Sequence, residues 1–265
     1  MSSYTFDNAW QQARRRLALL AETLDPVTQR RMQALGVAAG WQCLEIGAGG
    51  GSIAQWLCTQ LGPQGRVLAT DIDTRFLDAL AEPNLEVRRH DIVTDDLPDA
   101  AFDLVHTRLV LMHLPAREQV LTRLMAALKP GGWLLLEEHD IFPIGATTSG
   151  AYTRVWDAMS RAVTTAGARS DWGRELPGLL AQHGLDDIGA EGDVPFFHGT
   201  SPMAEFWRLS MIQLRERLSS VGASEHDVDS VLDLLNDPAR WFTGPALVAA
   251  WGRRPVSASA LLRGA

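Results

Sequence analysis

The chain has 265 residues, enough for one large or two small domains, and its 46% hydrophobic and 21% charged residues are typical of a globular protein. Its net charge of −8 argues against a nucleic-acid-binding protein, because such proteins usually carry a basic surface. No apolar run is long enough to span a bilayer and the N-terminus lacks a signal-peptide pattern, so we expect a cytoplasmic protein.

Two smaller features have ordinary structural interpretations. The arginine clusters Arg14-Arg15-Arg16 and Arg30-Arg31 are expected to be solvated helix faces. Cys43 and Cys58 are expected to be buried, reduced thiols, and two cysteines without clustered histidines make no structural zinc site.

Hydrophobic periodicity predicts two helices before the first strand, one over 8–22 and one from Asp25-Pro26, a cap residue followed by proline, to Gly36. From there short apolar strands alternate with helical segments. The predicted strands are 43–46, 66–70, 85–89, 102–106 and 133–137, and the helices between them are 53–61, 73–81 and 117–128. Residues 129–132, Lys-Pro-Gly-Gly, are expected to end the last of these helices.

The last hundred residues change character. Helical patterns cover 150–166, 173–184, 201–221 and 225–235, and strands are predicted over 188–197 and 246–253. Continuous apolar strands between helices favour a parallel sheet covered on both faces, and right-handed crossovers make that sheet doubly wound. The predicted fold class is therefore α/β.

The most informative segment is the loop after the first strand. Gly47, Gly49 and Gly51 follow Glu45 at alternate positions, and Ser52 stands where a dinucleotide fingerprint requires its third glycine or alanine. Such a loop lets a ligand approach the backbone at a helix N-terminus. The carboxylate of Glu45 would repel a pyrophosphate but suits a cation such as an ammonium. The pattern thus favours a zwitterionic ligand without phosphate.

Together these residues resemble motif I of the class I S-adenosylmethionine-dependent methyltransferases. The resemblance covers residues 41–140 and is especially close to the UbiE-like, type 11 group of small-molecule enzymes. It implies a Rossmann-like, mostly parallel sheet of seven strands, whose last two strands form an antiparallel hairpin. The expected domains are an N-terminal helical lid over 1–36, a methyltransferase core over 37–197 and 246–256, and a helical cap over 198–245 inserted between the last two strands.

The resemblance implies cofactor-binding residues in the first loop. Glu45 would face the ammonium of the methionine part of S-adenosylmethionine. The backbone of Gly47, Gly49 and Gly51 would approach that part, and the helix that begins at Ser52 would present its positive end to the carboxylate.

Further cofactor contacts are implied after the next strands. Asp71 ends the second strand, where a carboxylate accepts both ribose hydroxyls, and Ile72 would lie against the adenine. Asp91 would bond the adenine amino group, with Ile92 packing on the ring. Thr107, at the end of the fourth strand, would lie next to the sulfonium. No metal site is expected.

Methyl transfer is an in-line displacement at a carbon that the cofactor activates, so the protein must hold the nucleophile in line and exclude water. A phenol, alcohol or carbon acid would benefit from a general base. The candidates are His139 after the fifth strand, His113 after the fourth, and His198 at the start of the cap, with Glu138 and Asp140 as alternatives. His106, inside a strand, is expected to belong to the core.

The sequence therefore predicts a methyltransferase that acts on oxygen, nitrogen or carbon of a small, hydrophobic metabolite. Aromatic residues gather in the predicted cap and favour an apolar, closable pocket. The expected partners are a small-molecule substrate, with no nucleic acid and no membrane, and the protein is expected to be a monomer or homodimer. Three alternatives stay open: a cyclase or rearrangement enzyme that keeps the cofactor as structure, an NAD(P)-dependent oxidoreductase, and a non-catalytic binding module.

Overall fold

The computed structural model describes residues 6–146 and 150–256. Its main sheet has seven strands in the order β3-β2-β1-β4-β5-β9-β6. These strands are β1 (Gln42–Ile46), β2 (Arg66–Asp71), β3 (Leu85–Arg89), β4 (Phe102–Arg108), β5 (Leu128–Asp140), β6 (Asp186–Asp193) and β9 (Ala246–Arg253). β1 to β5 pair in parallel, whereas β9 runs antiparallel to both β5 and β6. The doubly wound, mostly parallel sheet is confirmed.

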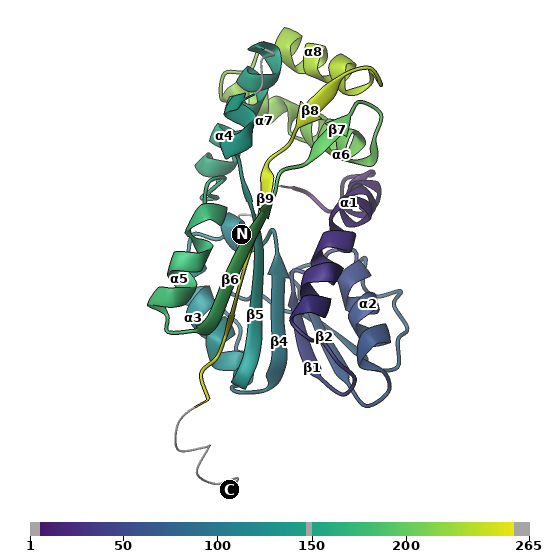
Figure 1. The fold of residues 1–265 in the computed structure, drawn as a ribbon. Helices are drawn as coiled ribbons and strands as arrows, with labels where there is room; N and C mark the ends of the chain where they lie inside the picture. Colours follow the sequence, from purple (N-terminus) through teal and green to yellow (C-terminus); the bar gives the residue numbers. More distant parts are fainter. Residues whose placement is uncertain (1–5, 147–149, 257–265) are drawn as a thin grey trace, which may run out of the picture.

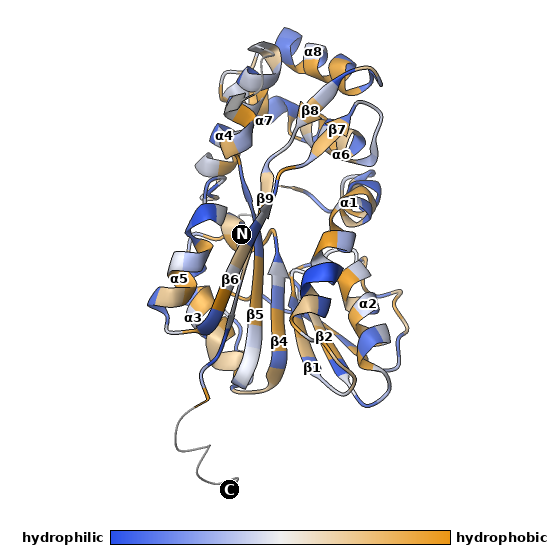
Figure 2. Cartoon of the chain, viewed as in Figure 1, coloured by the Kyte–Doolittle hydropathy of each residue, from blue (hydrophilic) through white to orange (hydrophobic). Residues whose placement is uncertain are grey.

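Helices cover both faces of this sheet (Figure 1). They are α1 (Ala13–Ala34), α2 (Ser52–Leu61), α3 (Arg117–Ala127) and α5 (Leu176–Gln182). On one face Met32 of α1 and Leu57 of α2 pack around Cys43; on the other, Leu121 and Leu180 pack against the strands. Figure 2 shows apolar residues concentrated in the central strands, as a sheet buried on both faces requires.

A second group of elements lies beyond the carboxyl ends of the parallel strands (Figure 1). It consists of α4 (Gly150–Thr165), α6 (Pro202–Gln213), α7 (Arg215–Ser220), α8 (Glu225–Leu235), and a separate hairpin of β7 (Phe196–His198) and β8 (Trp241–Thr243). Helices α6 to α8 stand between β6 and β9, as expected for the inserted cap. Helix α4 precedes β6 but packs against α7 and α8.

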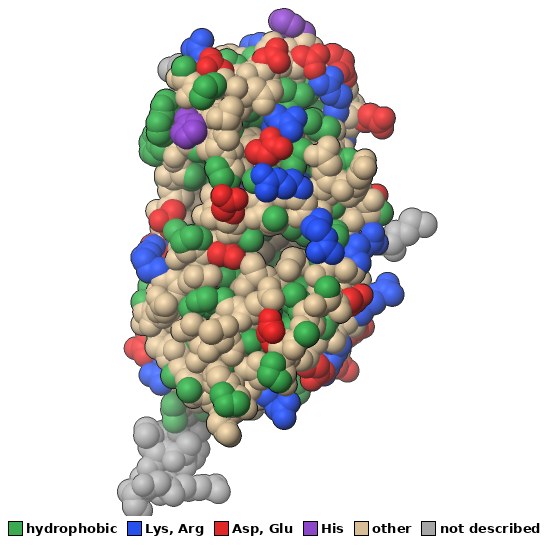
Figure 3. Space-filling view, turned by 90° about the vertical axis from the view of Figure 1, so that its right-hand side faces the viewer, with side chains coloured by type: hydrophobic (Ala, Val, Ile, Leu, Met, Phe, Trp, Pro, Cys, Tyr) green, Lys and Arg blue, Asp and Glu red, His purple; other side chains and the backbone are tan. Residues whose placement is uncertain are grey.

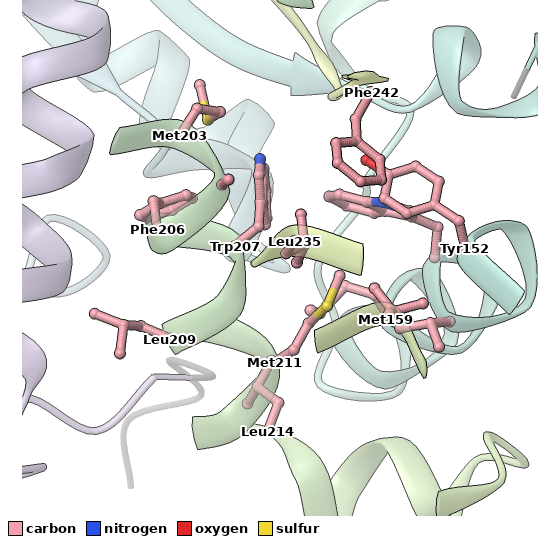
Figure 4. Packing of buried hydrophobic residues seen from close by; sticks show 14 of the residues in the cluster. Tyr152, Met159, Met203, Phe206, Trp207, Leu209, Met211, Leu214, Leu235 and Phe242 are labelled. Atoms are coloured by element: carbon pink, nitrogen blue, oxygen red, sulfur yellow. The ribbon is translucent and has the colours of Figure 1, made fainter. Parts of the chain in front are cut away.

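The cap elements share one apolar core, drawn in Figure 4. Trp207 of α6 stands edge-on to Trp156 of α4, with 4.5 Å between ring centroids, and Phe242 of β8 lies 5.2 Å from Tyr152. Because Leu19 and Leu24 of α1 join the same core, α1 touches both the sheet and the cap. The domain boundaries at residues 36, 197 and 245 stay a prediction, and residues 1–5 of the expected lid lie outside the described residues.

The predicted pair of N-terminal helices is wrong, because α1 is one continuous helix with Pro26 in its interior. An interior proline costs about 3 kcal/mol in a helix. Contacts on either side offset that cost: the Asp25 carboxylate accepts a 2.8 Å hydrogen bond from Arg108, and the Thr28 hydroxyl donates to Glu137 at 2.6 Å. Tertiary partners therefore override the local stop signal.

The predicted helix over 73–81 is also wrong, since this described stretch consists of turns. Asp71 Oδ1 accepts a hydrogen bond from the Asp73 backbone, and Asp73 Oδ1 accepts one from the Arg75 backbone. Such side-chain bonds compete with helix formation.

Three element boundaries also differ from the prediction. The 201–221 helix divides into α6 and α7 at Leu214, and the 188–197 strand divides between two sheets. Residues 129–132 belong to the beginning of β5. The two cysteines are free and buried, as expected.

Candidate active site

A cavity of about 1940 Å³ lies at the carboxyl ends of the parallel strands, underneath the cap. One part of its wall is the loop after β1 together with the ends of β2 and β3, including Gly47, Asp71 and Asp91. The other part comes from α1 and the cap, including Trp207 of α6. Ligands bind at this edge in open α/β sheets, and here two chemically different walls enclose one space.

The glycine loop has a backbone that requires glycine. At Gly47 φ is +67°, and a Cβ there would lie 2.2 Å from Val110 Cγ2. At Gly51 φ is +81°, and a Cβ would lie 2.5 Å from Leu80 Cδ1. Gly47 and Gly49 line the cavity, whereas Gly51 does not and instead caps the N-terminus of α2. The backbone N–H groups of Gly47 and Gly49 already donate to the Thr70 carbonyl and to Asp71, so what the loop brings to the cavity wall is its close-fitting backbone and the N-terminus of α2.

Asp71 fixes this loop to the end of β2. Its Oδ2 accepts a 2.9 Å hydrogen bond from the Gly49 backbone, and its Oδ1 accepts a 3.0 Å bond from the Asp73 backbone. Burial raises the pKa of Asp71 above its ordinary value, although these two hydrogen bonds act in the opposite direction. The carboxyl group lines the cavity, so its remaining lone pairs can accept from a ligand.

Three other predicted cofactor residues lie on the same wall. Ile72, Asp91 and Ile92 all line the cavity. Thr107 is fully buried in β4, where it pairs with Ile46, and is not among the lining residues, whereas the next residue, Arg108, is. The expected position of Thr107 next to the sulfonium stays a prediction.

Glu45 lines the cavity, but its carboxylate already has a protein partner. Glu45 Oε2 lies 2.6 Å from His106 Nδ1, and His106 Nε2 lies 3.2 Å from Glu137 Oε2. Burial alone would lower the pKa of His106, but the two carboxylates outweigh burial and raise it to about 9. Burial likewise opposes ionisation of Glu137, but the hydrogen bond from His106 prevails and lowers its pKa to about 2. His106 is in the core, as expected, but as an imidazolium between carboxylates.

This buried network continues into α1. Arg31 Nη1 lies 2.5 Å from Glu137 Oε1, and Arg31 also bonds Glu191 and Asp193 of β6. Arg31 and Arg16 are each 3% exposed, so the interpretation of both arginine clusters as solvated faces is wrong for these two residues. The sequence did contain a signal that an arginine such as Arg31 is buried. Acidic residues at the end of an apolar strand require a cation from elsewhere in the chain.

The three candidate histidines separate in space. His139 and His113 line the cavity. Burial lowers their pKa values to about 3 and about 4, so both imidazoles are neutral at physiological pH. His198 does not line the cavity; it packs on Trp241 in the hairpin, with Nδ1 2.6 Å from the Gly199 carbonyl. The hairpin register places it away from the site, contrary to expectation.

The alternative carboxyl groups lie outside the cavity wall as well. Glu138 is fully buried and its Oε1 accepts from the Leu111 backbone; burial raises its pKa to about 8. Asp140 forms an ion pair with Arg174, with 2.5 Å between Oδ1 and Nη2. These groups are buried rather than solvated, because β5 extends three residues further than the sequence pattern indicated.

Charge is mixed on the outer surface. On the face shown in Figure 3, basic and acidic side chains are interspersed and form no continuous basic patch among the described residues. Within the same residues, every helix is too short or too polar to cross a membrane.

Comparisons of this chain with known proteins agree on one class of protein. A family model described as a methyltransferase domain matches residues 44–134, the segment with the glycine loop and Asp71. Methyltransferase str2 of Strobilurus tenacellus is 31% identical over 185 residues, 68% of this chain and 65% of that protein. The UbiE C-methyltransferase of Pseudomonas fluorescens (strain Pf0-1) is 33% identical over 125 residues, 44% of this chain and 48% of that protein. The chain thus spans less than two thirds of either relative.

Among solved structures, the [4+2]-cyclase SpnF has a TM-score of 0.56 and 17% identity, covering 89% of this chain and 82% of that chain. This likeness concerns the fold. Fold and matched sequence together define a class: residues 44–134 form a methyltransferase domain, and the fold around them is that of the class I methyltransferases. Within that class, the chain is similar in sequence to UbiE and to methyltransferase str2.

Proposed function

We propose that the chain binds S-adenosylmethionine along the glycine-loop wall and transfers its methyl group to a small, hydrophobic molecule held under the cap. The observation that supports this most is that one cavity joins the two walls: a glycine loop tied to Asp71 on one side and buried aromatic side chains on the other. Such a cavity can hold two ligands side by side. The relatives named methyltransferases agree with this proposal.

The residues present fit this cofactor. The N-terminus of α2, reached past the glycine loop, suits its carboxylate, and Asp71 suits the ribose hydroxyls. Asp91, with Ile72 and Ile92, suits the adenine. Glu45 is shared with His106, so in this proposal it contributes negative charge toward the ammonium without being a free carboxylate. When bound, the cofactor supplies a methyl group that is already activated for displacement.

The chain's own part in the reaction is positioning and exclusion of water. Phe206 and Trp207 of α6 close the cavity with apolar surface, and α1 lies beside them. His139 and His113 line the cavity and are neutral, so each can accept a hydrogen bond from the substrate, but their lowered pKa values make them weak general bases. Whether the acceptor atom is oxygen, nitrogen or carbon depends on the substrate.

A second candidate function keeps the fold and the cofactor without the transfer. It is favoured by the likeness to SpnF, which is named as a [4+2]-cyclase. We consider it the alternative because the sequence relatives named here are methyltransferases.

Methyl-labelled S-adenosylmethionine distinguishes the two. The chain is incubated with labelled cofactor and a small-molecule extract of the source cells, and product and demethylated cofactor are quantified. Transfer predicts label in an organic-soluble product and an equal amount of S-adenosylhomocysteine. A product formed without label and without S-adenosylhomocysteine would identify the cyclase. We also propose that the protein is cytoplasmic, binds no nucleic acid, and is a monomer or homodimer.

A further inference from the structure

One cation inside the cavity stands out by its environment. Arg16 of α1 is 3% exposed, and its Nε and Nη2 atoms are buried with no hydrogen-bond partner among the described residues. Its guanidinium carbon lies 4.2 Å from the ring centroid of Phe6 and 5.7 Å from that of Phe206. Aromatic rings attract a cation but accept no conventional hydrogen bonds, so these two nitrogens are left unsatisfied by the protein, in a residue that lines the cavity.

The other arginines that line the cavity differ. Arg108 is paired with Asp25 and Thr28, and Arg75 with Asp73. Arg14, Arg89 and Arg217 are exposed to solvent. Burying a charge without a partner costs several kcal/mol, and proteins retain such a charge chiefly where a ligand compensates it. Arg16 therefore has the properties of an anion-binding group.

We propose that Arg16 binds a carboxylate of the substrate. The substrate is then a monocarboxylic acid with a hydrophobic body about as large as an aromatic ring system. This inference rests on the proposed function, because it assigns a ligand group to the substrate half of the same cavity. The planar guanidinium fork matches a carboxylate in a two-point hydrogen bond. His113 and His139 are neutral and Arg108 is paired with Asp25, so among the described lining residues Arg16 is the buried cation without a counter-ion, which suits a single negative charge.

A carboxylate could also come from the cofactor, but the geometry favours the substrate. Leu17, the next residue of α1, covers the glycine loop: its Cδ2 lies 3.6 Å from where a Cβ on Gly49 would be. Adjacent residues of a helix point about 100° apart. Arg16 consequently turns away from the loop toward Phe206 of α6 in the cap.

Binding of matched probes tests this assignment. Cinnamate and 1-naphthoate are titrated against their primary amides by calorimetry, with and without S-adenosylhomocysteine. We expect the wild type to bind each acid at least tenfold more tightly than its amide. Arg16→Met should abolish that difference and Arg16→Lys should retain part of it. Arg15→Met is the matched control, because Arg15 is exposed, lies outside the cavity wall, and should leave the preference unchanged. Circular dichroism confirms that each variant is folded.

Three results would overturn the proposal: equal binding of acid and amide, no binding of either acid, or an unchanged preference in Arg16→Met. A tenfold or greater loss of S-adenosylhomocysteine affinity in Arg16→Met would assign Arg16 to the cofactor instead. If the wild type binds no S-adenosylhomocysteine, the proposed function fails, and the titrations without it still decide the role of Arg16.

Discussion

Arg31 of α1 and Glu137 of β5 form an ion pair inside the protein, with 2.5 Å between Nη1 and Oε1 and almost no exposure of either side chain. They are 106 residues apart in the sequence. The pair fixes the C-terminal half of α1 to the middle of the sheet. Because His106 joins Glu137 to Glu45, the same network ends at the cavity wall.

Removing Arg31 should be far more costly than removing its neighbour. In Arg31→Met, Glu137 would keep His106 and Thr28 but lose the buried guanidinium, and the Glu191 and Asp193 carboxylates would lose it too, so we expect a loss of about 3–5 kcal/mol in the free energy of unfolding. Arg30→Met is the matched control: Arg30 binds Glu191, but its side chain is 57% exposed, so solvent screens the pair and the loss should be much smaller. Urea unfolding measures both, and equal losses would contradict the buried-pair account.

His106 should titrate well above an ordinary histidine. Its pKa of about 9 exceeds the unfolded value of 6.5, so its stabilising contribution is complete below pH 6.5 and disappears as pH rises through 9. The gap corresponds to about 3 kcal/mol, at about 1.4 kcal/mol for each tenfold change in proton affinity. NMR of the ¹³C-labelled imidazole measures the pKa directly. A midpoint near 6.5 would show that the two carboxylates do not hold the proton.

The adjacent residues Glu137 and Glu138 should respond to the same substitution with stability losses of very different size. Glu137→Gln removes a buried carboxylate that is charged and paired, and should cost about 3–5 kcal/mol at pH 7. Glu138, whose pKa is raised to about 8, is protonated at pH 7, so Glu138→Gln should change stability by no more than about 1 kcal/mol.

The pH dependence supplies a second readout for this pair. Glu138 binds its proton more tightly in the folded state, so its contribution to stability declines from pH 4.5 to 8. Glu138→Gln should remove that decline. Equal losses at pH 7 for the two glutamine variants would mean that both carboxyl groups are ionised.

The glycine loop permits a test that separates the cost of backbone strain from the cost of overpacking. Gly51→Ala places a methyl 2.5 Å from Leu80 and 2.9 Å from Leu77, at a φ of +81°. Gly36→Ala has nearly the same φ, +83°, with no atom within 4 Å. Both should lose about 1–2 kcal/mol from strain, but Gly51→Ala should lose about 1–3 kcal/mol more from overpacking. Thermal unfolding compares them, and identical losses would argue against close packing at the loop.

The features visible in the sequence are those with a local physical cause. Alternation of apolar strands and helices predicted the sheet, and the positions of Gly47 and Gly51 are dictated by a turn that only glycine fits. Asp71 could be singled out as a candidate cofactor-binding residue because it ends a strand at a fixed number of residues after that turn. These signals depend on residues near one another in the chain, and the structure confirms that they line or support one cavity.

What the sequence could not indicate depends on distant partners. Pro26 reads as a helix start, but contacts of its neighbours with β4 and β5 keep α1 continuous. Arg16 and Arg31 look like Arg15 and Arg30, yet two are buried and two exposed, because only the tertiary arrangement decides which side of α1 faces the protein. Likewise, His198 was expected at the cavity because the sequence pattern did not reveal the β7–β8 hairpin, which holds this residue elsewhere.

The central claim is that the glycine-loop wall holds S-adenosylmethionine, and calorimetric titration tests it most directly. We expect one molecule to bind per chain, with at least tenfold weaker binding in Asp71→Ala, where the ribose hydroxyls and the Gly49 backbone lose their acceptor. Asp99→Ala, an exposed change outside the cavity wall, is the control and should bind as the wild type does. Tight binding of NAD⁺ or NADP⁺ with no response to S-adenosylmethionine would contradict the account.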